Sequence, residues 1–237
     1  MQKQGQWLAA LSVLWGDSTE PVIMGAAVVV MRVHRTKTMP VSAPLIHFGY
    51  RTLVPSAEGE NEAILTEIDT TLIQARREAS VISWHNGADD LHVLNQMPRP
   101  NGAARLPGIE AVTAAWRDRT VREKGVALCV DTGYDLGPFG LISTTAQDHG
   151  LVPVPEFLGC QQQDDAQKAC DKLVFGAMPE TVTEFMAGSA LSSALTTALL
   201  GGKVTDRLHW DGELHIRDAM EAVAWDVLPN LFGSVRT

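Results

Sequence analysis

Two neighbouring carboxylates, Asp89 and Asp90, stand where the sequence changes from a strand pattern to a helix pattern. The apolar run at 81–84 is typical of a buried strand, and it ends at Asn86-Gly87, which is a strong turn signal. The residues after the two acids have the apolar spacing of a helix. A carboxylate at such a junction can bind a divalent metal ion at the rim of a sheet, and metal-bound water attacks phosphodiesters. The sequence therefore predicts phosphodiester chemistry at the end of this strand.

An α/β fold is predicted for the elements that position these acids. Three apolar runs, at 8–15, 22–33 and 46–54, precede them and indicate the strands of an antiparallel meander. A helix is expected over 60–80, because apolar residues recur there at helical spacing. These residues are Ile64, Leu65, Ile68, Leu72 and Ile73. Together with the strand at 81–84, this order predicts a mixed sheet flanked by helices.

The second half of the chain is predicted to be mostly helical. Helices are expected over 109–119, 144–149, 161–171, 179–200 (as one helix or two) and 215–232, with a short strand over 126–130. Gly150 is expected to close the second of these helices, and Gly201-Gly202 to end the fourth. Because no linker rich in Gly, Ser or Pro divides the chain, we expect a single domain over 1–237, with a candidate helical insertion at about 155–212.

Composition and charge exclude several classes of function. The 237 residues are 45% hydrophobic, which is enough for the core of one large domain, and the formal net charge is −9. An acidic chain gains no general attraction to a phosphate backbone, so a role in coating nucleic acid is disfavoured. The three cysteines form no Cys-x-x-Cys pair, which argues for free thiols in a reducing cytoplasm. The N-terminus has no secretory block and the apolar stretch 185–200 is short for a bilayer, so we expect a cytoplasmic protein without a membrane partner.

Three stretches resemble the DEDD group of 3′–5′ exonucleases, which are nucleases of the ribonuclease-H-like superfamily, and above all the exonuclease domain of family-B DNA polymerases. The stretch 81–94 is similar to the second motif of that family, in which an Asn-Gly turn precedes a metal-binding Asp; by position this is Asp90. Residues 129–153 look like a later segment, in which a strand ends in Asp. The stretch 221–228 looks like the last motif, a helix whose Asp, here Asp226, returns to the metal site.

This resemblance implies a fold, a cofactor and a substrate. The fold is a ribonuclease-H-like mixed sheet, with three antiparallel strands followed by parallel strands. Asp90 and Asp226 would be the catalytic residues and the ligands of Mg²⁺ or Mn²⁺, and the substrate would be the end of a single strand of DNA or RNA. His85 and Asn86 adjoin the turn and are the candidate substrate-binding residues, with a hydrogen-bonded structural role as the alternative for His85.

The sequence departs from the family in two of its motifs. The first strand of the family carries Asp-x-Glu, whereas Ser12 and Leu14 stand at these positions here. Asp17 and Glu20 lie just beyond this strand and are the candidate compensating acids. The last motif also lacks the Tyr or His that positions the attacking water. Because two carboxylates hold two metal ions poorly, this degenerate active site is expected to hydrolyse phosphodiesters weakly or not at all.

Three hypotheses about function follow. The first is a divergent, exonuclease-like, nucleic-acid-processing protein whose hydrolase activity is weak or lost. The second is a catalytically inactive exonuclease fold kept as a binding or assembly module with a protein partner. The third is an unrelated α/β domain, in which Asp90 only caps a helix and Asp131 is a turn residue at a strand end.

Overall fold

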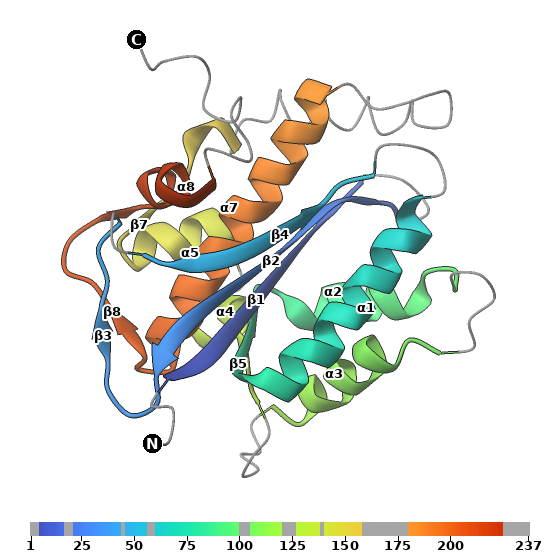
Figure 1. Ribbon diagram of the computed structural model, residues 1–237, viewed down its shortest axis with the longest axis horizontal. Coiled ribbons are helices and arrows are strands. Elements are labelled where there is room, and N and C mark those ends of the chain that lie inside the picture. The colour runs from blue at the N-terminus through green and yellow to red at the C-terminus, as the bar shows by residue number, and fades with distance from the viewer. Residues whose placement is uncertain are drawn as a thin grey trace.

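The computed structural model arranges the chain around one mixed sheet of five strands (Figure 1). It describes residues 5–16, 21–43, 46–55, 60–99, 105–119, 127–137, 140–157 and 180–224. The five strands are β1 (Gly5–Trp15), β2 (Ile23–His34), β4 (Phe48–Leu53), β5 (Ala79–Trp84) and β6 (Leu128–Asp131). Their spatial order is β4-β2-β1-β5-β6.

The strand directions divide the sheet into an antiparallel and a parallel half. Strand β2 runs antiparallel to both β1 and β4, whereas β5 is parallel to β1 and β6 is parallel to β5. The predicted meander and the α/β mixed sheet are therefore confirmed. Because β1, β5 and β6 share a direction, their carboxyl ends meet at one edge of the sheet. Trp15, Trp84 and Asp131 are the last residues of these three strands.

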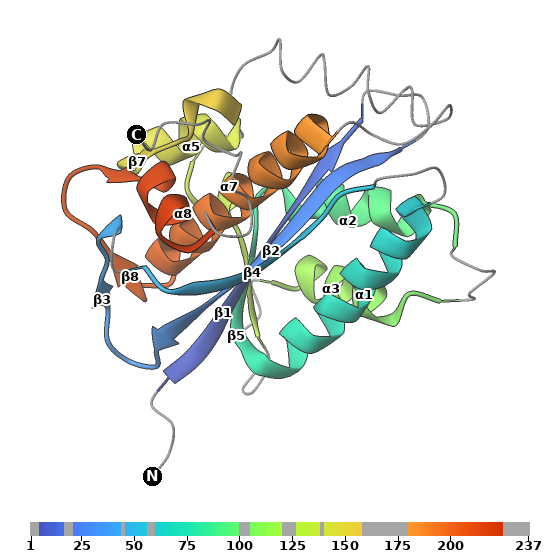
Figure 2. The ribbon, with the colours of Figure 1, turned by 45° about the horizontal axis from the view of Figure 1, so that its top comes forward.

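Three helices cover one face of the sheet: α1 (Glu60–Glu78), α2 (Gly87–Gln96) and α3 (Pro107–Arg117), seen together in Figure 2. The apolar stripe predicted for α1 is confirmed, because Ile64, Leu65, Ile68 and Leu72 are buried in the core beneath this helix, and Ile73 is half-buried. The face of the sheet below them is equally apolar. The sequences of strands β1 and β2 are therefore long apolar runs, as expected for strands that are covered on both sides.

The start of α3 is fixed by a buried acid from α1. Asp69 is 6% exposed, and its Oδ1 accepts a hydrogen bond of 2.9 Å from the backbone N–H of Ile109. The residue that precedes the helix, Leu106, has no side chain that could cap it. The two helices lie so close that a Cβ at Gly108 would stand 2.1 Å from the carbonyl oxygen of Asp69. The side chain of Asp69 therefore caps the N-terminus of α3, whose own local sequence provides no capping side chain.

Replacing this cap is expected to destabilise the fold. In Asp69→Ala the backbone N–H of Ile109 stays buried without an acceptor, so the free energy of unfolding should fall by roughly 1–2 kcal/mol. Chemical denaturation would measure this loss. The exposed neighbour on the same helix provides the control, since Thr70→Ala should change the free energy by less than about 0.5 kcal/mol. Equal effects of the two variants would contradict the capping role.

The opposite face of the sheet is covered by one long helix, α7 (Glu180–Val204), which packs against β1, β2 and β5. Ser83 of β5 donates a hydrogen bond of 2.9 Å to the carbonyl oxygen of Thr197. The predicted end of this helix at Gly201-Gly202 is wrong. A Cβ at Gly201 would lie 2.2 Å from Ser83 Oγ, and one at Gly202 would lie 2.4 Å from Leu208, so the two glycines allow close packing inside the helix. This part of the candidate insertion at 155–212 forms a layer of the domain.

Short elements pack on the outer side of α7. They are β3 (Met39–Pro40), α4 (Thr132–Asp135), α5 (Ile142–Asp148), β7 (Leu151–Val152), η3 (Pro155–Phe157), β8 (Leu208–His209), β9 (Leu214–His215) and α8 (Ile216–Ala224). The helix predicted at 144–149 is confirmed in α5, and Gly150 follows it with a φ of 78°. The last predicted helix begins at Ile216, whereas the one predicted over 161–171 lies outside the described residues.

Among the described residues, α7 is the one helix whose length and composition would allow it to cross a membrane. Of its most apolar window, 89% is buried inside the domain. The sheet lies on one side of α7 and the short elements lie on the other, so the helix is apolar nearly all round. Its composition is that of a core helix.

Candidate functional site

The predicted site lies at the edge where β1, β5 and β6 end. Asn86 adopts the left-handed conformation, with a φ of 56°, and α2 begins at Gly87. This confirms the strand, turn and helix that the Asn-Gly pair predicts. A Cβ at Gly87 would stand 2.6 Å from the ring of Trp116, so this position also needs glycine for space. Asp90 therefore lies in the first turn of α2, at a fixed position beside the sheet.

Asp90 holds two tryptophan side chains together. Its Oδ1 accepts a hydrogen bond of 2.7 Å from Trp15 Nε1, and its Oδ2 accepts one of 2.6 Å from Trp84 Nε1. The N-cap residue of α2 is Asn86, so the alternative that Asp90 only caps this helix is wrong. The carboxylate instead joins the ends of β1 and β5 to α2, and each of its oxygens is engaged by an indole.

The environment of Asp90 disfavours its charged form. Burial raises the pKa of the Asp90 carboxyl to about 7, although the hydrogen bonds from Trp15 and Trp84 oppose this shift. The nearby charges of Asp89 and Asp131 raise the pKa further. Asp89 itself is exposed on the same turn, as expected for a solvated acid in a first turn. A proton is therefore gained or lost at Asp90 close to neutral pH.

A second carboxylate, Asp131 at the end of β6, is held in a similar way. Its Oδ1 accepts hydrogen bonds from the backbone N–H groups of Asn86 (3.1 Å) and Gly133 (3.2 Å), and its Oδ2 accepts one from Trp116 Nε1 (3.2 Å). Asp131 is 4% exposed and caps helix α4, which confirms its position at a strand-end turn. The rings of Trp116 and Trp84 meet edge to face, with centroids 6.3 Å apart. Three indoles thus donate hydrogen bonds to two carboxylates, the half-buried Asp90 and the buried Asp131.

His85 is engaged inside the protein through both ring nitrogens. Nε2 lies 3.0 Å from the carbonyl oxygen of Gly140, and Nδ1 lies 3.1 Å from the hydroxyl of Thr132. A carbonyl only accepts, so Nε2 carries the proton, and Nδ1 of the neutral ring accepts from the hydroxyl. Burial lowers the pKa of His85, against the opposing effects of the Gly140 hydrogen bond and of Asp131. The hydrogen-bonded structural alternative for His85 is confirmed, while a contact with substrate stays a prediction.

A cavity of about 230 Å³ opens beside Asp90. Strand β1 contributes Ser12 and Leu14 to its wall, the two residues that align with the Asp-x-Glu pair of the exonucleases that the sequence resembles. Helix α7 contributes Ser193 and Thr197, and the turn after β5 contributes His85 and Asn86. Leu141, which is 75% exposed, stands at the rim. Within the described lining, Asp90 is the one carboxylate, and three hydroxyl groups share the cavity with it, those of Ser12, Ser193 and Thr197.

The described residues do not fit a centre of two metal ions. They contain no group of three or more His, Cys, Asp or Glu side chains placed to hold a metal ion. Mg²⁺ and Mn²⁺ need several oxygen ligands, whereas both oxygens of Asp90 already accept hydrogen bonds from the indoles of Trp15 and Trp84. Asp226, Asp17 and Glu20 lie outside the described residues. In the part that the structure describes, the Asp90 carboxylate binds tryptophan side chains through both oxygens.

Sequence reasoning found part of this site and missed the rest. It identified Asp90, His85 and Asn86, which do meet at the end of β5. It missed the tryptophan partners of Asp90 and Asp131. A tryptophan at the end of an apolar strand was a usable signal, because a buried indole N–H needs an acceptor. It also missed Thr197, whose buried hydroxyl lacks a hydrogen-bond partner among the described residues. No protein-family model matches the sequence, and no curated protein matches it, so the assignment of function depends on the geometry of the site.

Proposed function

We propose that this chain is an inactive exonuclease-like domain of the ribonuclease-H fold, kept as a binding or assembly module. The order and directions of its five strands support the fold, because three antiparallel strands are followed by two parallel ones. The Asn-Gly turn that brings Asp90 to the sheet edge supports the ancestry. The nuclease relationship and the cytoplasmic location are both parts of this proposal.

The observation that carries the loss of catalysis is the bonding of Asp90. Two indole N–H groups at 2.6 and 2.7 Å occupy the carboxylate that would bind a metal ion in an exonuclease. Ser12 and Leu14 stand at the positions of two further acids, and neither can bind Mg²⁺ as a carboxylate does. Hydrolysis by two metal ions needs both ions held beside the scissile phosphate. The described residues are arranged for packing and hydrogen bonding instead.

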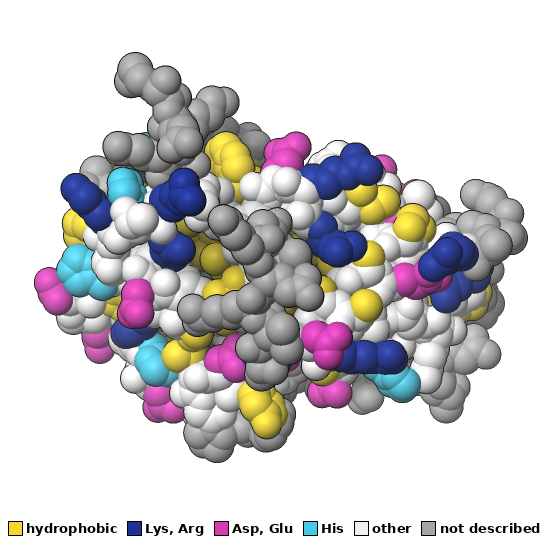
Figure 3. Space-filling view, turned by 90° about the horizontal axis from the view of Figure 1, so that it is seen from below, with side chains coloured by type: hydrophobic (Ala, Val, Ile, Leu, Met, Phe, Trp, Pro, Cys, Tyr) yellow, Lys and Arg dark blue, Asp and Glu magenta, His cyan; other side chains and the backbone are white. Residues whose placement is uncertain are grey.

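The surface charge favours a protein partner over a nucleic acid. With a formal net charge of −9, the chain repels a phosphate backbone unless a local basic track compensates. Figure 3 shows that Lys and Arg side chains alternate with Asp and Glu on the face drawn there, with hydrophobic side chains between them. A single strand of DNA or RNA would find no continuous basic path across the described part of this face. An assembly role with another protein is therefore the form of the proposal we favour.

A nuclease assay tests the proposal directly. Incubation with end-labelled single-stranded DNA or RNA and either Mg²⁺ or Mn²⁺ should release no nucleotides above the level without protein. Asp90→Ala should behave like the unmodified protein in this assay, and calorimetry should detect no pair of bound Mn²⁺ ions. Cleavage that Asp90→Ala abolishes and Asp89→Ala preserves would overturn the proposal. That result would establish the second candidate, an active divergent exonuclease that uses Asp90 and Asp226.

A further inference from the structure

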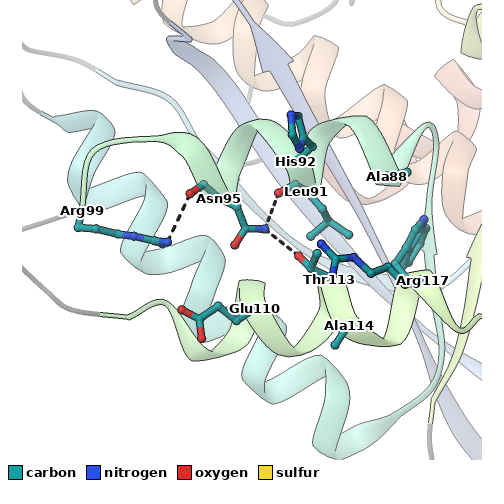
Figure 4. A pocket seen from close by; sticks show the side chains of 10 residues that line it. Ala88, Leu91, His92, Asn95, Arg99, Glu110, Thr113, Ala114 and Arg117 are labelled. Atoms are coloured by element: carbon teal, nitrogen blue, oxygen red, sulfur yellow. Dashed lines mark hydrogen bonds between the residues drawn. The ribbon is translucent and has the colours of Figure 1, made fainter.

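A groove of about 520 Å³ runs between the antiparallel helices α2 and α3 (Figure 4). Leu91 and Trp116, both buried, form its apolar floor. Asn95 and Thr113 face each other across it, and Asn95 Nδ2 donates a hydrogen bond of 2.8 Å to the hydroxyl of Thr113. This bridge ties the two helices together. The groove is therefore preformed, and its volume lies within the usual range of small-molecule sites.

Two arginines line the groove, and they reach into it from opposite ends (Figure 4). Arg117 is exposed, and it makes no hydrogen bond or ion pair with another described residue. Arg99 is half-buried; its Nη2 donates to the carbonyl oxygen of Asn95 at 3.3 Å, while its Nη1 is buried without any described partner. A buried guanidinium N–H without an acceptor is costly. Arg117 thus retains unused capacity for an anion, and Arg99 would bind one once its guanidinium turns toward the groove, since Nη1 is shielded as it stands.

The acid of the groove is paired with a third arginine, although its charge also acts on Arg99. Glu110 lies in the lining, but its Oε2 accepts two hydrogen bonds from Arg105, from Nε at 2.9 Å and from Nη2 at 2.7 Å. Arg105 stands outside the lining and is the salt-bridge partner of Glu110. Arg99 and Arg117 therefore give the groove a positive charge within a chain of net charge −9. Charge complementarity selects an anionic occupant.

We propose that this groove binds a small organic anion that carries two acidic groups joined by an apolar spacer. The two acidic groups would bind Arg99 and Arg117, because a guanidinium fork matches a carboxylate or a phosphate. The spacer would lie over Leu91 and Trp116. The limited volume of the groove and its two separate arginines favour such a molecule over a polynucleotide, whose backbone requires a longer basic track. This site is distinct from the cavity at Asp90 and does not depend on the proposed function.

Calorimetry with suberate, a dicarboxylate with an apolar chain, tests the proposal. Suberate should bind the full chain, and octanoate, which has the same chain but one acidic group, should bind at least about tenfold more weakly, since one charged hydrogen-bonded pair is lost. Arg99→Gln and Arg117→Gln should each weaken suberate binding by about tenfold, for the same reason. Arg77→Gln is the matched control, because it removes the same charge from the exposed end of α1 and should leave the affinity unchanged.

Several results would overturn the proposal. Equal affinities for suberate and octanoate would show an apolar groove without recognition of two charges. An equal loss in Arg77→Gln would show a general effect of charge rather than a site. Absence of binding for every dicarboxylate from succinate to suberate would also contradict it. If a single-stranded oligothymidylate then bound and lost affinity in both groove variants, the occupant would be nucleic acid. Circular dichroism of each variant would confirm that it is folded.

Discussion

Raising the pH from about 5 to about 8 is expected to lower the free energy of unfolding by roughly 3 kcal/mol through one group, Asp90. Burial raises the pKa of this carboxyl from 3.8 to about 7, so the folded protein retains a proton that the unfolded chain has already released. The stabilisation is complete below the unfolded pKa and is lost as the pH rises through the folded pKa. Above about pH 8 the contribution of Asp90 should stay constant.

Asp90→Asn isolates this contribution, because an amide does not titrate. Urea unfolding of both proteins across the pH range should give two curves that diverge, with the unmodified protein losing more stability as the pH rises. Asp89→Asn is the control. Asp89 is the exposed neighbour of Asp90, and its charge is a minor cause of the raised Asp90 pKa after burial, so this variant should keep the loss of stability with rising pH and move its midpoint only slightly to lower pH. Parallel curves for Asp90→Asn and the unmodified protein would mean that Asp90 is not protonated in the fold near neutral pH.

Asp90→Ala is expected to lower the free energy of unfolding by roughly 2–4 kcal/mol at about pH 6. The variant removes the acceptor of two indole N–H groups, and Trp84, which is 0% exposed, has no access to water as a replacement. It also leaves a void at the junction of β1, β5 and α2. Denaturant unfolding followed by far-ultraviolet circular dichroism would measure the loss.

The neighbouring acid again provides the comparison. Asp89→Ala shortens an exposed side chain on the same turn, so its effect should stay within about 0.5 kcal/mol. If Asp90→Ala matched this small value, the two indole hydrogen bonds would contribute nothing to stability. The interpretation of Asp90 as a structural centre would then fail.

Elements with strong local patterns could be predicted from the sequence. The apolar runs of β1, β2, β4 and β5 and the helical stripe of α1 identify these elements, because burial on a known face imposes a fixed spacing. The Asn-Gly pair identifies the turn before α2, because Asn86 tolerates the left-handed backbone there. From these signals the mixed sheet and the placement of Asp90 at its edge both follow.

Partners that meet only in the folded chain could not be predicted from local patterns. Trp15 and Asp90 are separated by 75 residues, and which side chain meets which depends on strand register and helix packing. The glycines of α7 misled the prediction for a related reason. Glycine is common just after a helix, so Gly201 suggests a helix end. In the fold, its missing side chain leaves room for Ser83, which belongs to a strand more than a hundred residues earlier. Local spacing carries no information about such neighbours.

The position of α7 has a consequence for synthesis on the ribosome. Every strand of the five-stranded sheet has been synthesised once Asp131 is made, yet the helix that covers one face of this sheet begins only at residue 180. Apolar side chains of that face, including Leu8 and Val29, pack in the finished protein against a cluster that includes Leu191 and Leu195. At a translation rate of roughly 5–20 residues per second, this face of the nascent sheet remains uncovered by α7 for several seconds. This interval is when a chaperone would be needed, and chains that terminate before α7 should aggregate.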